Sequence, residues 1–202
     1  MNRRRFLSSL AASAAVGCAG GESAVCPETG EQIEGPYYLD AQAVRIDITE
    51  GKSGIALSLR LTVVDAETCA PIADAVVDVW HADADGVYSG YAEMGTEGET
   101  FLRGVQLTTA SGACQLETIF PGFYTGRTSH IHVAVRAEGY RELVTQLYFS
   151  RAAITTVAPD YPAIDEYTTN IEDGYYDADN EMVTAGDNAA GYAATYTLSL
   201  SA

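Results

Sequence analysis

Basic side chains are scarce in this 202-residue chain. It has 11 Lys and Arg against 28 Asp and Glu, a formal net charge of −17, and no Lys or Arg follows Arg151. A negative field of that size repels a phosphate backbone, which argues against nucleic acid as a partner. Long apolar runs are also missing, because no stretch reaches the about 18 residues that a membrane-spanning helix needs. The rest of the composition, 47% hydrophobic and 19% charged, suits one globular domain with a sizeable core.

Residues 1–25 have the pattern of an export signal, with arginines followed by a weakly apolar run of Ser, Leu, Ala and Val. Arg3 and Arg4 fit a twin-arginine signal, the route of proteins that cross the membrane already folded. Two processing outcomes stay open: lipidation of Cys18, whose Ala-Val-Gly-Cys context lacks the usual leucine, or a simple cut a few residues later. An uncleaved cytoplasmic N-terminus is the remaining alternative. We therefore expect an exported protein, in the periplasm, on the cell surface or secreted, with its folded domain in residues 26–202.

Cysteine is also rare, with four residues in the chain. After export, Cys26, Cys69 and Cys114 face an oxidising compartment, where one disulfide forms and one thiol remains. Their spacing matches no zinc pattern, and the sequence does not determine the pairing. The pairs of Cys69 with Cys114 and of Cys69 with Cys26 are the first to test, and three unpaired, buried cysteines are the alternative.

Short β-rich runs separated by turn residues fill most of the chain up to residue 150. In the first run, from Ile55 to Asp65, apolar residues alternate with polar or small ones, as in a strand with one buried face. No stretch carries a sustained period of 3.6 residues. The pattern predicts an all-β protein, a single-domain β-sandwich with long irregular loops. The predicted strands are 55–65, 75–80, 101–108, 114–120, 129–135, 143–149 and 194–200, with a surface loop at 89–100.

The segment 155–191 differs in composition, with acids, Tyr, Asn, Gly and Ala and no basic residue. It is too long for a bare hairpin loop, so we expect an irregular acidic C-terminal lobe with a short helix. A disordered tail is the competing interpretation, which the many tyrosines disfavour. The residues expected to pack the lobe on the sandwich are Tyr161, Tyr167, Tyr175 and Tyr176.

Two of the three histidines lie two positions apart in the sequence. Side chains alternate across a strand, so a strand through His130, Ile131 and His132 points both imidazoles to one face. Imidazole is the commonest metal ligand among side chains, which makes the pair a candidate metal site. A polar stripe on an exposed strand is the plain alternative. The same short segment also contains a phenol and a guanidinium, those of Tyr124 and Arg127.

A second segment, residues 79–88 (VWHADADGVY), runs from a predicted strand through an Asp-Gly turn to another tyrosine. With residues 35–38 (GPYY) upstream and 145–149 (TQLYF) downstream, the two segments resemble the intradiol ring-cleavage dioxygenases, the family of protocatechuate 3,4-dioxygenase and catechol 1,2-dioxygenase. The resemblance covers roughly residues 33–150 in the same order. Each of these motifs alone is weak evidence for the family, but their combined order and spacing are specific to it.

The resemblance implies a non-haem ferric ion, Fe(III), held by two tyrosines and two histidines. By position, these ligands are Tyr88, Tyr124, His130 and His132. The chemistry of the donors agrees, because a phenol that normally loses its proton at about pH 10 needs a strong Lewis acid to be ionised at neutral pH. Hard phenolate oxygens also favour Fe(III) over Fe(II). No organic cofactor is implied.

The implied activity is that of an oxidoreductase that uses O2 to open a catechol-type ring between its two hydroxylated carbons, giving a cis,cis-muconate-type diacid. In the family, the tyrosine at the position of Tyr124 is displaced by substrate and takes up a proton. Arg127 matches an arginine beside the substrate ring, and Gln146 matches a glutamine that assists it. A salt bridge is the plain alternative for Arg127, and a buried hydrogen bond at a strand end is that for Gln146.

Other residues of the matching segments receive no catalytic role. We expect His81 and Trp80 to serve packing, and residues 35–38 either to line the pocket mouth or to form a plain turn. Catechol dioxygenases carry an N-terminal helical region, and the chain before Gly35 is too short for one. The sequence leaves open whether the protein forms a homo-oligomer. The alternative function is an exported, non-catalytic β-sandwich module that binds carbohydrate or protein.

Overall fold

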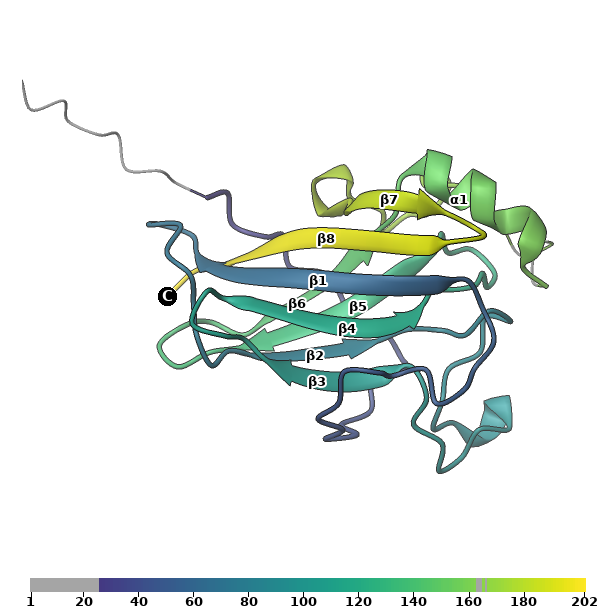
Figure 1. Ribbon diagram of the computed structural model, residues 1–202, viewed down its shortest axis with the longest axis horizontal. Helices are drawn as coiled ribbons and strands as arrows, with labels where there is room; N and C mark the ends of the chain where they lie inside the picture. Colours follow the sequence, from purple (N-terminus) through teal and green to yellow (C-terminus); the bar gives the residue numbers. More distant parts are fainter. Residues whose placement is uncertain (1–25, 163–164, 166) are drawn as a thin grey trace, which may run out of the picture.

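The computed structural model describes residues 26–162, 165 and 167–202, and it shows two four-stranded sheets packed face to face (Figure 1). The predicted all-β sandwich is confirmed. The predicted export signal, with Arg3, Arg4 and Cys18, lies outside the described residues. The first sheet has the order β4 (Ala113–Ile119), β1 (Ala56–Asp65), β8 (Gly191–Leu200) and β7 (Val183–Asp187), and the second has the order β3 (Arg103–Leu107), β2 (Val76–Trp80), β5 (His130–Arg136) and β6 (Leu143–Tyr148).

The first sheet buries one face, as the alternating sequence of β1 predicts. Leu57, Leu59 and Leu61 point into the core with at most 1% of their surface exposed, while the residues between them are partly exposed. In the register, Leu59 lies opposite Leu116 of the antiparallel β4 and opposite Ala194 of the parallel β8. These aliphatic side chains form the layer against which the second sheet packs.

The second sheet is buried on both faces. Every residue of β5 except Arg136 is buried, including His130 and His132 on the face that points away from the core. That face is covered by the N-terminal segment 32–45. Backbone hydrogen bonds join the start of this segment to β6, through Gln32 N and Val144 O (2.8 Å), and its end to β3. The candidate site lies where this segment passes over the sheet.

The structure differs from the prediction mainly in the segment 155–191. The residues predicted as an irregular lobe contain β7 and the beginning of β8. β7 has no apolar alternation, because it is an edge strand whose residues are almost all exposed. The short helix also begins earlier than expected, since α1 spans Arg151–Val157 and is capped by the hydroxyl of Ser150. Three short 3-10 helices complete the described elements: η1 (Ala92–Met94), η2 (Ala158–Asp160) and η4 (Ala178–Asn180).

Three of the four predicted tyrosines pack this segment on the sandwich, whereas Tyr175 is 49% exposed. Tyr161 is buried, and its hydroxyl donates to Phe120 O (2.6 Å). Tyr167 contacts Phe123 edge to face, and Tyr176 contacts Tyr148 in the same way. The competing interpretation of a disordered tail is therefore wrong for the described part of this segment.

The disulfide joins Cys26 to Cys69, one of the two pairs expected, and leaves Cys114 as a buried free thiol. Burial raises the pKa of that thiol to about 11, which keeps it protonated and unreactive at neutral pH. The disulfide ties the start of the folded domain to the turn after β1. None of the helices in the described residues is long and apolar enough to span a membrane.

Candidate metal centre

The candidate ligands lie on the outer face of the second sheet, beneath the segment 32–45. His130 and His132 share this face, as their spacing predicts, while Ile131 between them is fully buried in the core. His132 lies directly opposite Trp80 on β2 and opposite Gln146 on β6. The indole of Trp80 stacks on the His132 ring, with 5.1 Å between the centroids and 9° between the planes. Packing against this rigid neighbour fixes the plane of the imidazole.

The two imidazoles and one phenol bring their donor atoms together. His130 Nε2 lies 3.1 Å from Tyr124 Oη and 3.1 Å from His132 Nε2. His130 Nδ1 faces Thr128 O at 2.7 Å, and because a carbonyl only accepts, Nδ1 holds the proton and Nε2 presents a lone pair. Metal–nitrogen bonds of about 2.0–2.1 Å place neighbouring donors roughly 3 Å apart, so each of these two pairs of atoms has the spacing of neighbouring ligands on one ion.

Burial keeps both imidazoles neutral. It lowers the pKa of His130 to about 3, with a further contribution from the nearby Arg127 charge. Burial also holds the pKa of His132 well below its ordinary value, and the neighbouring His130 acts in the same direction. A neutral imidazole is the form that binds a metal, so the site is ready for one at neutral pH.

The two candidate tyrosines are delivered by turns that touch backbone to backbone. Gly122 N donates to Asp83 O (3.0 Å), which joins the turn before Tyr124 to the turn before Tyr88. A Cβ at Gly122 would lie 2.4 Å from Asp83 O, and a Cβ at Gly86 would lie 2.1 Å from Phe123 O. Only glycine allows this approach, which fixes the spacing of the two phenol rings.

The Gly122→Ala substitution tests this contact. Gly122 has no positive φ, so alanine is excluded there by the Asp83 and Ala84 carbonyl oxygens alone. We expect a loss of about 2 kcal/mol in the free energy of unfolding and a lower iron content after loading, because the turns must separate. Urea unfolding and metal analysis measure the two effects. Gly30→Ala is the control, since a Cβ there makes only an ordinary contact, 3.6 Å from Asp177 Oδ2, and equal behaviour of the two variants would contradict the account.

Tyr88 has the buried polar atom that most needs an explanation. The residue is 1% exposed, and its hydroxyl has no hydrogen-bond partner among the described residues. Burial raises the pKa of this phenol well above its ordinary value, and the neighbouring Tyr124 adds to the effect. A buried hydroxyl without a partner costs free energy, and a cation at the site removes that cost by accepting the oxygen as a ligand. The chemistry of the donors thus fits a metal.

Phenol oxygens are needed to complete a ligand set. No three His, Cys, Asp or Glu side chains gather to hold a metal within the described part of the chain. Tyr88 and Tyr124 lie with 5.8 Å between their ring centroids, and the Tyr88 ring is 6.2 Å from that of His132. The four residues that the sequence singled out therefore meet at one place, and two phenols with two imidazoles are the donors available there.

The N-terminal segment forms the cover of the site. Gly35 has φ +76°, and a Cβ there would lie 3.1 Å from His132 Cε1, so the backbone passes directly over the imidazole. Tyr37 stacks on Tyr88 at 4.5 Å between centroids and contacts Tyr124 edge to face. Residues 36 and 37 form a turn, one of the two interpretations of residues 35–38, and this turn packs on the candidate ligands.

Arg127 forms the salt bridge that the sequence analysis gave as its plain alternative. Its Nε forms an ion pair with Asp173, at 3.1 Å from Oδ1 and 3.0 Å from Oδ2. Its Nη1 also faces Tyr124 Oη at 3.5 Å, and its Nη2 donates to Gln146 Oε1. Gln146 is fully buried and donates in turn to Ile33 O at 2.9 Å. The guanidinium therefore faces the phenol of Tyr124, a candidate ligand, and the carboxylate of Asp173 balances its charge.

Arg103 and Asp173 are two site residues that the sequence analysis missed. Arg103 lies opposite Trp80 in the sheet and is 1% exposed. Its Nε donates to Ser89 Oγ (2.9 Å) and its Nη2 to Ser89 O (2.8 Å), which fixes the backbone next to Tyr88. The sequence signal for Arg103 is its place in a β-rich run, because a basic residue is seldom buried in a strand unless it has a partner there.

His81 is structural, in agreement with its predicted packing role. The ring is 1% exposed and lies between Thr118 Oγ1 and Ala82 O, each 2.7 Å from a ring nitrogen. Burial lowers the pKa of His81 to about 4, so it is neutral. Both nitrogens are occupied, which leaves none for a metal.

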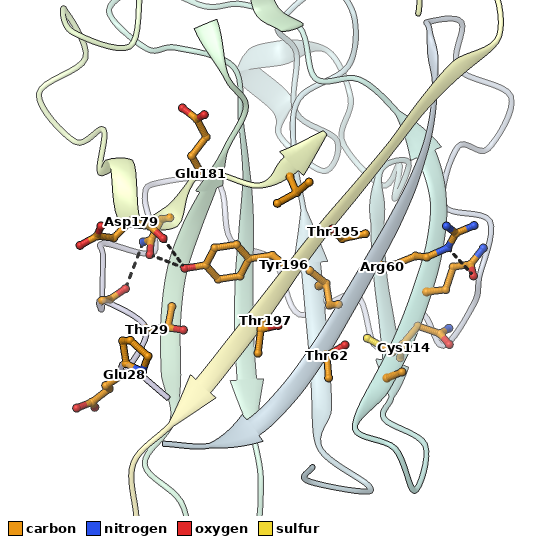
Figure 2. A pocket seen from close by; sticks show the side chains of 18 of the residues that line it. Glu28, Thr29, Arg60, Thr62, Cys114, Asp179, Glu181, Thr195, Tyr196 and Thr197 are labelled. Atoms are coloured by element: carbon orange, nitrogen blue, oxygen red, sulfur yellow. Dashed lines mark hydrogen bonds between the residues drawn. The ribbon is translucent and has the colours of Figure 1, made fainter. Parts of the chain in front are cut away.

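A cavity of about 1110 Å³ lies elsewhere, over β1 and β8 of the first sheet (Figure 2). Figure 2 shows Thr62, Thr195 and Thr197 along these strands and Tyr196 directed toward Asp179, whose backbone oxygen accepts its hydroxyl at 2.8 Å. None of the candidate ligands lines this groove, and no histidine does. It is therefore separate from the site described above.

Two phenols and two imidazoles gathered at the outer face of one sheet of a β-sandwich are donors that suit a metal ion, and comparison with known proteins identifies the family. The chain belongs to the intradiol ring-cleavage dioxygenases. The family model described as "Dioxygenase" matches residues 33–164, which include all four candidate ligands. These matches do not favour the alternative of a non-catalytic binding module.

Individual relatives agree with this assignment. The chain is 32% identical over 139 residues to a chlorocatechol 1,2-dioxygenase from Pseudomonas sp. strain P51, covering 58% of this chain and 54% of that protein. The solved intradiol ring-cleavage dioxygenase from Tetranychus urticae has a TM-score of 0.79 at 30% identity, covering 87% of this chain and 95% of that one. The dioxygenase domain of a dioxygenase carbohydrate-binding protein fusion from Streptomyces sp. SirexAA-E has a TM-score of 0.68 at 32% identity, covering 86% and 98%. The chain spans about half the length of the curated relatives it matches.

Proposed function

We propose that this protein is a non-haem Fe(III) dioxygenase that opens a catechol-type ring between its hydroxylated carbons. The supporting observation is the group of donor atoms around His130 Nε2, with Tyr124 Oη and His132 Nε2 each at 3.1 Å, beside the partnerless buried hydroxyl of Tyr88. These four residues would hold the iron. When bound, a ferric ion supplies the Lewis acidity that ionises the phenols and the catechol hydroxyls. Both atoms of O2 enter the cis,cis-muconate-type product, so no organic cofactor is needed.

The two tyrosines differ in what surrounds them, which assigns them different roles. Tyr88 is fully buried behind Tyr37, whereas Tyr124 is partly exposed and contacts Arg127 and His130. Tyr124 is therefore the phenol that a substrate reaches first. We assign it the role of taking up a proton from the catechol as the substrate binds, while Tyr88 stays in place.

Arg127 stabilises the negative charge that develops on the substrate during ring opening. Its guanidinium is held by Asp173 and Gln146 before the substrate arrives, so no reorganisation is needed during the reaction. The charge of Arg127 is already balanced by Asp173, and the chain has a net charge of −17. Both features favour a neutral catechol over a carboxylated one.

Oxygen uptake by the iron-loaded protein tests the proposed reaction. The panel is catechol, hydroxyquinol, protocatechuate and larger lignin-like catechols, with product identified by mass spectrometry. We expect one O2 consumed for each catechol and a diacid that contains both oxygen atoms. No uptake with any catechol, or a product opened beside rather than between the hydroxylated carbons, would contradict the proposal.

We also propose that the protein acts outside the cytoplasm, after export through the twin-arginine route. The Cys26–Cys69 disulfide supports this, because such bonds persist in oxidising compartments. Fractionation of expressing cells, with the mass of the N-terminal peptide, distinguishes lipidation of Cys18 from a simple cut. An intact N-terminus in the cytoplasmic fraction would contradict export.

A further inference from the structure

Asp173 lies outside the residues 33–164 that match the family, yet its carboxylate is part of the site. Its side chain has 0% exposure, although the residues on either side of it, Glu172 and Gly174, are exposed. A lone buried carboxylate in a surface turn is costly, so its partners must account for its position. We call the segment 169–176 that carries it the Asp173 turn.

All the partners of this carboxylate lie in or beside the candidate site. Besides the two contacts with Arg127 Nε, Oδ2 accepts from Thr128 N (3.0 Å) and Oδ1 accepts from Tyr175 N (2.9 Å). Thr128 is the residue whose carbonyl orients His130. One carboxylate thus joins the catalytic arginine, the start of β5 and the Asp173 turn.

The Asp173 turn is itself held firmly on the second sheet. Asn170 accepts from Thr128 Oγ1 (2.8 Å) and donates to Phe149 O (3.0 Å). Tyr175 O accepts from the Tyr148 hydroxyl (2.8 Å), and the Tyr175 ring lies 4.9 Å from the Arg127 guanidinium carbon. The guanidinium is therefore confined between the carboxylate, an aromatic ring and Gln146, and its Nη1 is left to face Tyr124.

We propose that Asp173 is a positioning residue for Arg127, and that the Asp173 turn is part of the active site. The inference rests on the proposed dioxygenase function. Among the described residues Asp173 forms no hydrogen bond with a candidate ligand, so we assign its effect on the reaction to the direction that it gives the guanidinium. A buried ion pair contributes little net stability, because desolvation offsets the attraction. The pair is better explained by the orientation that it imposes on Arg127.

Steady-state kinetics of the Asp173→Asn protein test the proposal. We expect the iron content, the visible spectrum and KM for catechol to be retained, and kcat to fall about tenfold to a hundredfold, as for a misplaced catalytic group. Glu31→Gln is the matched control, because it also removes the carboxylate partner of an arginine, that of Arg141 at 2.8 Å, in an exposed ion pair outside the site. Its kcat should equal that of the wild type.

The Arg127→Gln background separates positioning from folding. If Asp173 acts through Arg127, then Asp173→Asn causes no further fall in kcat there, and the double variant melts at a higher temperature than Arg127→Gln, since no unpaired charge remains buried. A further fall in kcat in that background would overturn the proposal, as would wild-type kcat in iron-loaded Asp173→Asn.

Asp173→Glu keeps the ion pair and with it the charge balance of the fold. Its longer side chain displaces the guanidinium, so we expect kcat between those of the wild type and Asp173→Asn. A wild-type kcat would show that charge alone suffices and would overturn the proposal. A colourless wild type without turnover overturns the proposed function itself, whereas a coloured, active wild type with unaffected Asp173 variants overturns only this inference.

Discussion

Tyr88→Phe is expected to bleach the iron-loaded protein and to abolish turnover while making the iron-free protein more stable. A tyrosinate bound to Fe(III) absorbs visible light by charge transfer, so the loaded wild type should be burgundy. Phenylalanine removes the ligand oxygen, and we expect iron affinity to fall by more than about a hundredfold, a loss that even outer-shell partners can cause. The same change removes a buried hydroxyl without a partner, which should raise the free energy of unfolding by about 1 kcal/mol.

This prediction is specific because the same Tyr88→Phe change should stabilise the iron-free protein and abolish turnover. Visible absorbance, metal analysis and urea unfolding measure the three quantities. Tyr140→Phe is the control, because that phenol bonds to Asp65 away from the site and should leave colour and turnover unchanged. A Tyr88→Phe protein that keeps its colour, or one that is destabilised without iron, would contradict the role of Tyr88. His130→Ala should also lose iron and colour, since it removes the donor atom at the centre of the group.

Arg127→Ala is expected to slow ring opening by roughly a hundredfold, the equivalent of about 3 kcal/mol in the barrier, because a fixed donor facing the substrate is lost. It should also cost about 3 kcal/mol in unfolding free energy, since the Asp173 carboxylate is left buried without its cation. Colour and substrate chelation should remain, because Arg127 is not a candidate ligand. Rapid-mixing absorbance and urea unfolding separate these effects.

Arg141→Ala is the matched control for the loss of one arginine. Its ion pair with Glu31 is more than half exposed on both sides, so we expect less than about 1 kcal/mol of destabilisation and no kinetic change. If Arg127→Ala loses iron instead, then Arg127 has a structural role. If Arg127→Ala unfolds no more easily than Arg141→Ala, the ion pair of Arg127 with Asp173 does not stabilise the fold as its burial predicts.

Local patterns were enough to predict the sandwich and the meeting of the two imidazoles. The period of two in β5 fixes His130 and His132 on one face, and strong alternation reveals strands such as β1. β7 was missed because an exposed edge strand carries no apolar pattern. The family resemblance, rather than spacing, brought Tyr88 into the candidate ligand set.

Other parts of the site depend on contacts between distant segments, which no local pattern reports. Asp173 reaches Arg127 from a turn 46 positions along the chain, and Gly35 meets His132 only because the N-terminal segment folds back over the sheet. Arg103 appears in the sequence as a basic residue within a strand, and its link to Ser89, next to Tyr88, is visible only in the folded chain. Contacts between segments that are distant in the sequence decide these roles.

Anomalous diffraction at the iron edge, from crystals of the ferric-loaded protein, tests the central claim most directly. The account predicts a peak bounded by the phenol oxygens of Tyr88 and Tyr124 and by Nε2 of His130 and His132. A crystal with no iron at this place, or with iron only among the carboxylates of the groove over β1 and β8, would contradict it.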